Sequence, residues 1–334
     1  MLLFAAAYRA RLILVNRRDY PGSTPFTDTE LALLGSQNLQ THGKALVQQG
    51  LDIGLFLAWL VRKEKIPPVS IDPDGNKRGG IALVPWSLAH TPLAGFLAHA
   101  DTLPADARKA LEPCLRAYCI FGRCFPSTPS QLPRMAQFNS TRPPDAPHIL
   151  FGLLTLSKYH PLLDPTYSME ERVPCFHSWV STYYTHSNFA RRTRKPALLD
   201  TTPIPYPVPP CARPATLDVI DPVLLESVSW HGPIQGSEAL LHGMLLSLAF
   251  EQTRRILFDK GAGRVLPRCK VVVVWGENTL WEMVGAAWSM ERLYKERKAV
   301  GKVGRSLEVM EMPGANHFVS PFKFLPLVGL VKRR

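Results

Sequence analysis

The stretch Ile81-Ala-Leu-Val-Pro-Trp-Ser-Leu-Ala89 decides how the rest of the chain is interpreted. Its apolar run has the composition of a buried strand, and a helix-compatible segment, residues 90–100, follows the serine. A serine between a strand and a helix is the layout of a nucleophile elbow, in which a strained turn exposes the hydroxyl above a sheet. The usual pattern there is G-x-S-x-G. Here Pro85 and Ala89 take the glycine positions, and proline is larger and lacks an N–H.

The composition is that of a globular protein with a basic balance. The 334 residues are 46% hydrophobic and 20% charged, and the formal net charge is +12. Because the basic residues are spread along the chain without a nucleic-acid-binding motif, we expect solvated charge and no nucleic-acid partner. The six cysteines form no C-x-x-C pair with matched histidines. We therefore expect no metal, no other cofactor and no disulfide framework.

The N-terminal stretch MLLFAAAYRARLILV contains an apolar run that arginines soon interrupt. This run is too short for a signal peptide or a membrane-spanning helix. Together with the free thiols, it leads us to expect a cytoplasmic protein with no membrane span.

Apolar segments with the length of buried strands alternate with segments of helical periodicity. Besides the run at Ile81, strands are predicted at Arg11–Val15, Leu115–Phe121, Cys269–Gly276 and Leu307–Met312. Helical periodicity is found from Asp28 to Leu60, at 90–100, at Gly236–Lys260 and at Thr279–Val300. This alternation predicts an α/β fold with a doubly wound, mostly parallel sheet.

A proline-rich region interrupts this alternation. Many of the 31 prolines lie between residues 125 and 215, where the strand pattern is lost. We predict a helical, proline-rich cap insertion over 126–265, and a core made of 1–125 and 266–334, closed by the apolar stretch Phe322–Val331.

Three residues that follow predicted strands form a chemically coherent set: Ser87, Glu277 and His317. The carboxyl ends of parallel strands meet at one edge of a sheet, where ligands bind. A serine hydroxyl becomes nucleophilic when a histidine removes its proton, and a carboxylate orients that histidine. The order serine, acid, histidine is the order of the triad in one class of α/β enzymes.

Four segments together resemble the α/β-hydrolase superfamily, and within it the fungal-type serine hydrolases: NRRDYPGSTP, GGIALVPWSLA, VVVVWGENTLWE and MPGANHF. The resemblance covers most of residues 8–120 and 265–320. It implies an α/β-hydrolase fold with a variable cap, Ser87 as nucleophile and His317 as base. It also implies an oxyanion-hole N–H at Leu88 and a structural D-x-P-G turn from Asp19 to Gly22.

The triad acid is open between two glutamates. The family often carries G-x-x-D after the penultimate strand, but Gly276-Glu-Asn-Thr279 has threonine at the last position. Glu277 is the nearest carboxylate and is favoured here, and Glu282 lies about one turn further on. Trp86 and Leu88 are expected either to line an acyl pocket or simply to pack.

Two features depart from the family pattern. The family places an oxyanion-hole motif, often His-Gly, before the strand that corresponds to Arg11, and only ten residues precede Arg11. The sequence is therefore expected to be shortened at its N-terminus relative to the family. Pro85 is the second departure. Two hypotheses follow: an esterase-like hydrolase of a small or medium apolar ester, or a non-catalytic relative that lacks a complete oxyanion hole.

Overall fold

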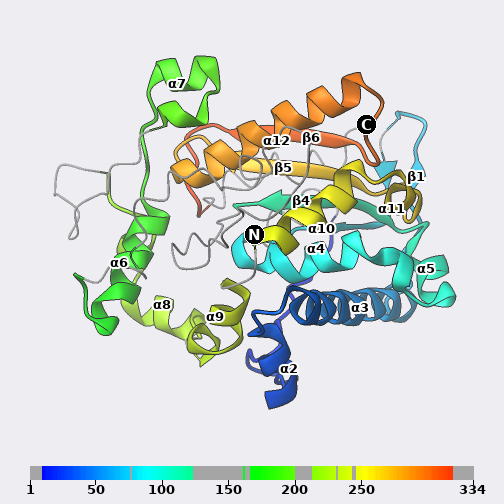
Figure 1. Ribbon diagram of the computed structural model, residues 1–334, viewed down its shortest axis with the longest axis horizontal. Helices are drawn as coiled ribbons and strands as arrows, with labels where there is room; N and C mark the ends of the chain where they lie inside the picture. Colours follow the sequence, from blue (N-terminus) through cyan, green and yellow to red (C-terminus); the bar gives the residue numbers. More distant parts are fainter. Residues whose placement is uncertain are drawn as a thin grey trace.

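The computed structural model describes residues 10–75, 77–122, 161, 166–199, 213–230, 232–242 and 246–318. Its centre is a four-stranded parallel sheet with the strand order β3-β4-β5-β6 (Figure 1). The strands are β3 (Ile81–Leu83), β4 (Leu115–Phe121), β5 (Lys270–Gly276) and β6 (Leu307–Met312). The strands predicted near 115, 269 and 307 are thus present, and their bounds differ from the predicted ones by one residue at most.

The described helices flank this sheet or extend beyond its edge (Figure 1). The longest are α3 and α12, and α2 begins at a capping box in which Thr27 and Glu30 bond reciprocally. A small antiparallel hairpin, β1 (Ser70–Ile71) and β2 (Lys77–Arg78), lies outside the main sheet. The helices are α2 (Asp28–Leu34), α3 (Leu39–Lys63), α4 (His90–Ala98), α5 (Ala105–Leu111), α6 (Met169–Ser181), α7 (Asn188–Thr193), α8 (Pro222–Val228), α9 (Ser237–His242), α10 (Leu246–Phe258), α11 (Lys260–Arg264) and α12 (Trp281–Ala299).

The main hydrophobic core lies between the sheet and helices on one of its faces. Tyr118 and Val273 point into this core with side chains from α3, α4, α5, α10 and α12. Cys119 and Val272 point to the opposite face, where the buried cluster contains no residue of a described helix. Each crossover moves to the next strand in the same direction, and right-handed crossovers of that kind place their helices on one face. Over the described ranges, the helices therefore pack against one face of the parallel sheet, and the predicted doubly wound arrangement, with helices on both faces, is not seen.

Helix α3 forms a second layer outside α4. At their crossing, a Cβ on Gly50 would lie 2.5 Å from the backbone carbonyl carbon of Gly95 and from the backbone nitrogen of Phe96. Only glycine allows the two helices to approach this closely. Leu46, Leu57 and neighbouring residues bury the inner face of α3, so this helix is part of the core.

The strand predicted at Arg11–Val15 was wrong. The segment lies outside the sheet, and Ile13, Leu14 and Val15 are 41%, 76% and 57% exposed. Arg11 instead pairs with Glu64 at the end of α3, with 2.6 Å between Nη1 and Oε2. The apolar, branched composition predicted burial, but composition does not say whether a neighbouring strand is available for pairing.

The described core extends into the region predicted as the cap. Ile256 and Leu257 of α10 are buried in the main cluster, and Arg255 Nε donates to the backbone carbonyl of Ala98 at 2.9 Å. Helix α10 packs on α4, so residues 246–265 are structurally part of the core layer. Much of the rest of the predicted cap, including residues 123–160, lies outside the described residues, as does the stretch Phe322–Val331.

Candidate active site

Ser87 lies at the turn between β3 and α4, with a backbone φ of +53°. A residue with a Cβ rarely adopts this left-handed conformation, and it does so at sites that the surrounding structure constrains. A 3-10 turn, Ser87–Ala89, leads directly into α4. Strand, strained serine and helix therefore follow one another as in a nucleophile elbow.

Pro85 lies two residues after the end of β3 and contacts β4 through its carbonyl. Its carbonyl accepts from the backbone N–H of Phe121 at 3.2 Å, and Trp86 forms a parallel bridge with Phe121. Because β3 ends at Leu83, the missing N–H of Pro85 falls beyond the end of the described strand.

His317, in the loop after β6, lies at the same edge of the sheet as the serine turn. Its ring centroid is 5.5 Å from that of Trp86, and Trp86 Nε1 donates to the His317 carbonyl at 3.2 Å. A Cβ on Gly122, the residue after β4, would lie 2.8 Å from His317 Nδ1. The loops after β3, β4 and β6 therefore meet around this imidazole.

The imidazole of His317 has no carboxylate partner in the part of the chain that the structure describes. Its Nδ1 lies 3.1 Å from Met283 Sδ, and no hydrogen bond joins its ring to Ser87 over the same ranges. The side chain is only 2% exposed, and this burial lowers the pKa of His317 to about 3. The ring is therefore neutral at physiological pH and, in this environment, a weak base.

Glu277, the favoured acid, is engaged elsewhere. Its Oε1 lies 2.5 Å from Nη1 of Arg191 in α7, and its Oε2 accepts from the backbone N–H of Gly314 at 2.6 Å. Arg191 also pairs with Glu311 at 2.9 Å. Glu277 therefore ties α7 to the loop that leads from β6 to His317.

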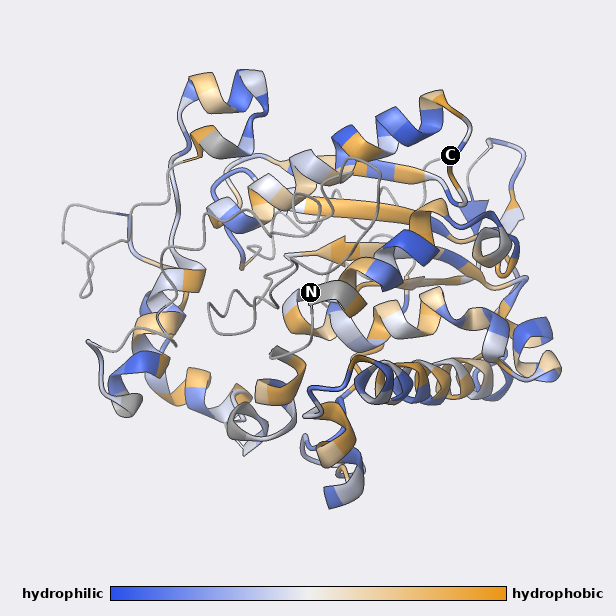
Figure 2. Cartoon of the chain, viewed as in Figure 1, coloured by the Kyte–Doolittle hydropathy of each residue, from blue (hydrophilic) through white to orange (hydrophobic). Residues whose placement is uncertain are grey.

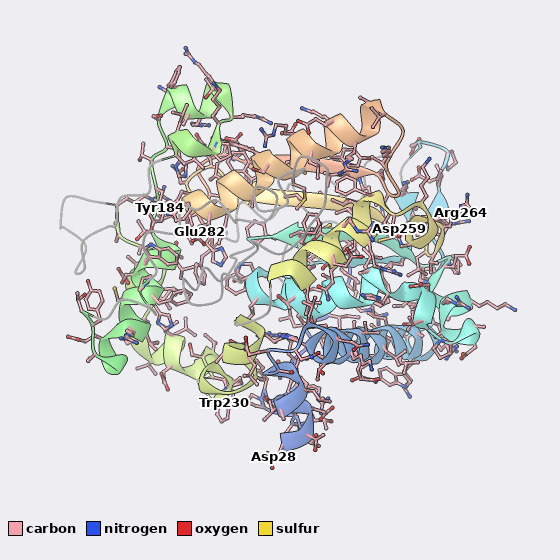
Figure 3. All side chains as sticks on the ribbon, in the orientation of Figure 1. Asp28, Tyr184, Trp230, Asp259, Arg264 and Glu282 are labelled. Carbon is pink, nitrogen blue, oxygen red and sulfur yellow. The ribbon has the colours of Figure 1, made fainter. Side chains whose placement is uncertain are left out.

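Glu282, the alternative acid, is buried in the first turn of α12 (Figure 3). Neither of its carboxyl oxygens has a hydrogen-bond partner among the described residues. Burial raises the pKa of Glu282 to about 8, so the group is mostly protonated at neutral pH. It immediately precedes Met283, whose sulfur contacts His317.

The other residues predicted for the site have simpler surroundings. Asp19 and Gly22 lie in a turn with φ of +71° and +78°, and Asp19 Oδ1 accepts from the Phe26 N–H at 2.7 Å. Leu88 packs against the main core, and Trp86 is 43% exposed.

Sequence reasoning missed three residues that shape the site: Gly122, Met283 and Arg191. Gly122 follows a predicted strand directly, so its position could have indicated a loop that approaches the site. Nothing in the sequence around Met283 or Arg191 predicted contact with His317 or Glu277.

Two pockets adjoin this region. One, of about 20 Å³, is apolar and lies between β4, β5 and α12; its volume is about that of one water molecule. The other, of about 350 Å³, is more polar and lies beside α7 and α12. The small pocket is lined by Ile120, Gly122, Val273, Val274, Trp275, Met283, Ala286, Ala287 and Met290. The larger one is lined by Asn188, Arg191, Arg192, Arg194, Trp275, Trp288 and Glu311.

Over the described ranges, no group of three or more histidine, cysteine, aspartate or glutamate side chains could hold a metal ion.

A scan against models of protein families, a search of curated proteins and a search of solved structures found no match to this chain. The sequence motifs and the geometry around Ser87 and His317 are therefore the features that indicate a function.

Proposed function

We propose that the protein is a serine hydrolase of the α/β-hydrolase type that cleaves a carboxylic ester of a small or medium apolar substrate. The left-handed backbone of Ser87, at a turn between a parallel strand and a helix, is the observation that carries this proposal. It is supported by His317, which reaches the same edge of the sheet from the loop after β6.

In the proposed reaction, Ser87 Oγ attacks the ester carbonyl carbon while His317 accepts the hydroxyl proton. The N–H of Leu88 stabilises the oxyanion, and the alcohol leaves with the proton from His317. Water, deprotonated by the same histidine, then cleaves the acyl–Ser87 ester and restores the serine.

A carboxylate at Nδ1 of His317 would raise the basicity of the imidazole for this reaction. Met283 Sδ now lies at that position, 3.1 Å away. Glu277 is held by Arg191 and Gly314, whereas Glu282 has two unpartnered oxygens in the described chain and is the neighbour of Met283. We therefore propose Glu282 as the acid, reached by a shift in the first turn of α12.

A second candidate is a non-catalytic member of the same fold. The contact between His317 and Met283 favours it, because a buried imidazole with a thioether partner is a poor base. Such a protein would retain the pocket and the serine turn and would bind a ligand without turnover.

Labelling with a fluorophosphonate separates the two candidates. We expect an adduct on Ser87 by mass spectrometry, lost in Ser87→Ala and in His317→Gln. Glu282→Gln should slow labelling more than Glu277→Gln if Glu282 is the acid. A folded native protein that acquires no adduct at Ser87 would contradict the hydrolase proposal and favour the non-catalytic one.

A further inference from the structure

The outer face of α3 combines apolar exposure with unpaired positive charge. Trp59 and Leu55 are 53% and 42% exposed, and the Phe56 ring stacks on Trp59 at 6.0 Å between centroids. Single exposed apolar residues are ordinary on protein surfaces, but contiguous ones mark interaction sites. We call this surface the α3 face: Leu55, Phe56 and Trp59, with the segment Ile13–Val15.

The segment Ile13–Val15 is held beside α3 by ion pairs at both ends. Arg11 pairs with Glu64 at 2.6 Å, and Arg18 lies 4.0 Å from Asp52. This segment is more exposed than α3 itself, with Leu14 at 76%. The two elements therefore present apolar side chains along the same stretch of surface.

The charges at this surface leave a positive excess. Glu64 and Asp52 are near arginines, and Arg62 pairs with Asp106 at 2.8 Å. Three exposed lysines of α3 and its C-terminal end have no carboxylate partner in the described chain: Lys44, Lys63 and Lys65. A helix with apolar side chains, an exposed tryptophan and lysines at its ends has the pattern of a helix that lies in a membrane interface.

Helix α3 also has the length and apolar composition of a membrane span, and it is the one described helix that does. In its most apolar window, 44% of the residues are buried inside the protein. The close contact of Gly50 with Gly95 and the packing on α5 hold α3 within the fold. It can therefore lie on a bilayer but cannot cross one without disrupting the core.

We propose that the α3 face binds the surface of a membrane that contains anionic lipids. In Figure 1, α3 lies in the lower part of the molecule, with α4 between it and the sheet and α2 below its left end. Figure 2 shows apolar residues interleaved with polar ones along this helix. On contact, Trp59, Leu55 and Leu14 enter the interface, while Lys44, Lys63 and Lys65 meet lipid phosphates and carboxylates. The overall charge of +12 favours approach to such a surface.

The test is co-flotation of the full chain with vesicles, without any substrate. We expect binding to phosphatidylcholine vesicles that contain phosphatidylserine, weakened by salt, and much weaker binding to phosphatidylcholine alone. Lys63→Gln with Lys65→Gln should reduce the affinity for the anionic vesicles by about 30-fold, since each lysine near the surface contributes about fivefold. Trp59→Gln should weaken binding to both kinds of vesicle.

Matched controls use the same residue types elsewhere on the surface. Lys298→Gln with Lys302→Gln changes exposed lysines at the end of α12, and Trp230→Gln changes a tryptophan that is 52% exposed beyond α8 (Figure 3). Both should bind like the native protein. The proposal fails if the native protein does not float with anionic vesicles, or if the control lysines matter equally. It also fails if light scattering shows a dimer that Trp59→Gln dissociates, because a second copy would then cover the α3 face.

Discussion

The buried carboxyl group of Glu282 makes a quantitative prediction about stability. Its pKa of about 8 in the folded protein compares with 4.5 for an exposed glutamate. Between these values the folded chain retains a proton that the unfolded chain has lost, so stability falls as pH rises. One pH unit corresponds to 1.36 kcal/mol. The free energy of unfolding should therefore fall by about 2 kcal/mol from pH 6.5 to pH 8.

His317 acts in the opposite direction below pH 6.5. Its pKa of about 3 compares with an ordinary value of 6.5, so in this window only the unfolded chain binds the proton and acid destabilises the fold. Between about pH 4.5 and 6.5 the contributions of Glu282 and His317 cancel. From these two groups alone, the free energy of unfolding of the native protein should be constant in that window and should fall at lower and at higher pH.

Glu282→Gln removes the titrating group and leaves a side chain of similar shape. The variant should keep its stability from pH 6.5 to 8 and lose roughly 2 kcal/mol from pH 6.5 to 4.5, because His317 is no longer opposed. Urea unfolding at pH 4.5, 6.5 and 8 measures this. The matched control is Glu296→Gln, on the same helix, whose side chain is 62% exposed and which should follow the native profile. Native and Glu282→Gln profiles that run parallel above pH 6.5 would refute the assigned burial of this carboxyl.

Three further variants test the geometry of the turn, the layers and the histidine. Ser87→Gly should be about 1 kcal/mol more stable to urea than Ser87→Ala, because glycine adopts the φ of +53° without strain; equal stabilities would contradict the left-handed assignment. Gly50→Ala should lower the free energy of unfolding by about 1–3 kcal/mol, because its Cβ would lie 2.5 Å from the backbone of α4. A loss no larger than that of Gly43→Ala, which would meet only a Leu248 side-chain atom at 3.3 Å, would argue against this crossing. Gly122→Ala should slow fluorophosphonate labelling on the order of 10²-fold, with the circular dichroism spectrum unchanged, because its Cβ displaces His317; an unchanged rate would remove this imidazole from the reaction.

The central strands could be predicted because their apolar runs have the length of a strand and the composition of a buried one. Val271, Val272, Val273 and Val274 are at most 6% exposed, so an uninterrupted branched run matches a strand buried on both faces. The turn at Ser87 could be predicted from local order alone, since a strand and a helix must be joined there. The segment Arg11–Val15 shows the limit of that reasoning. Its composition is equally apolar, but its position depends on ion pairs with Glu64 and Asp52, which lie far from it in the sequence.

The same distinction explains why the positions of Ser87 and His317 at one edge of the sheet could be predicted, whereas the surroundings of the two glutamates could not. Ser87 and His317 follow strands, and a parallel sheet brings those positions to one edge whatever the loops do. Glu277 and Glu282 are five residues apart at that edge, and they differ in the tertiary contacts of their carboxylates. Arg191, from a helix with no strand or motif beside it, neutralises Glu277, while packing leaves Glu282 without a partner in the described chain. Replacement of Arg191 should therefore release Glu277 from its ion pair, while Glu282→Gln should still slow labelling more than Glu277→Gln.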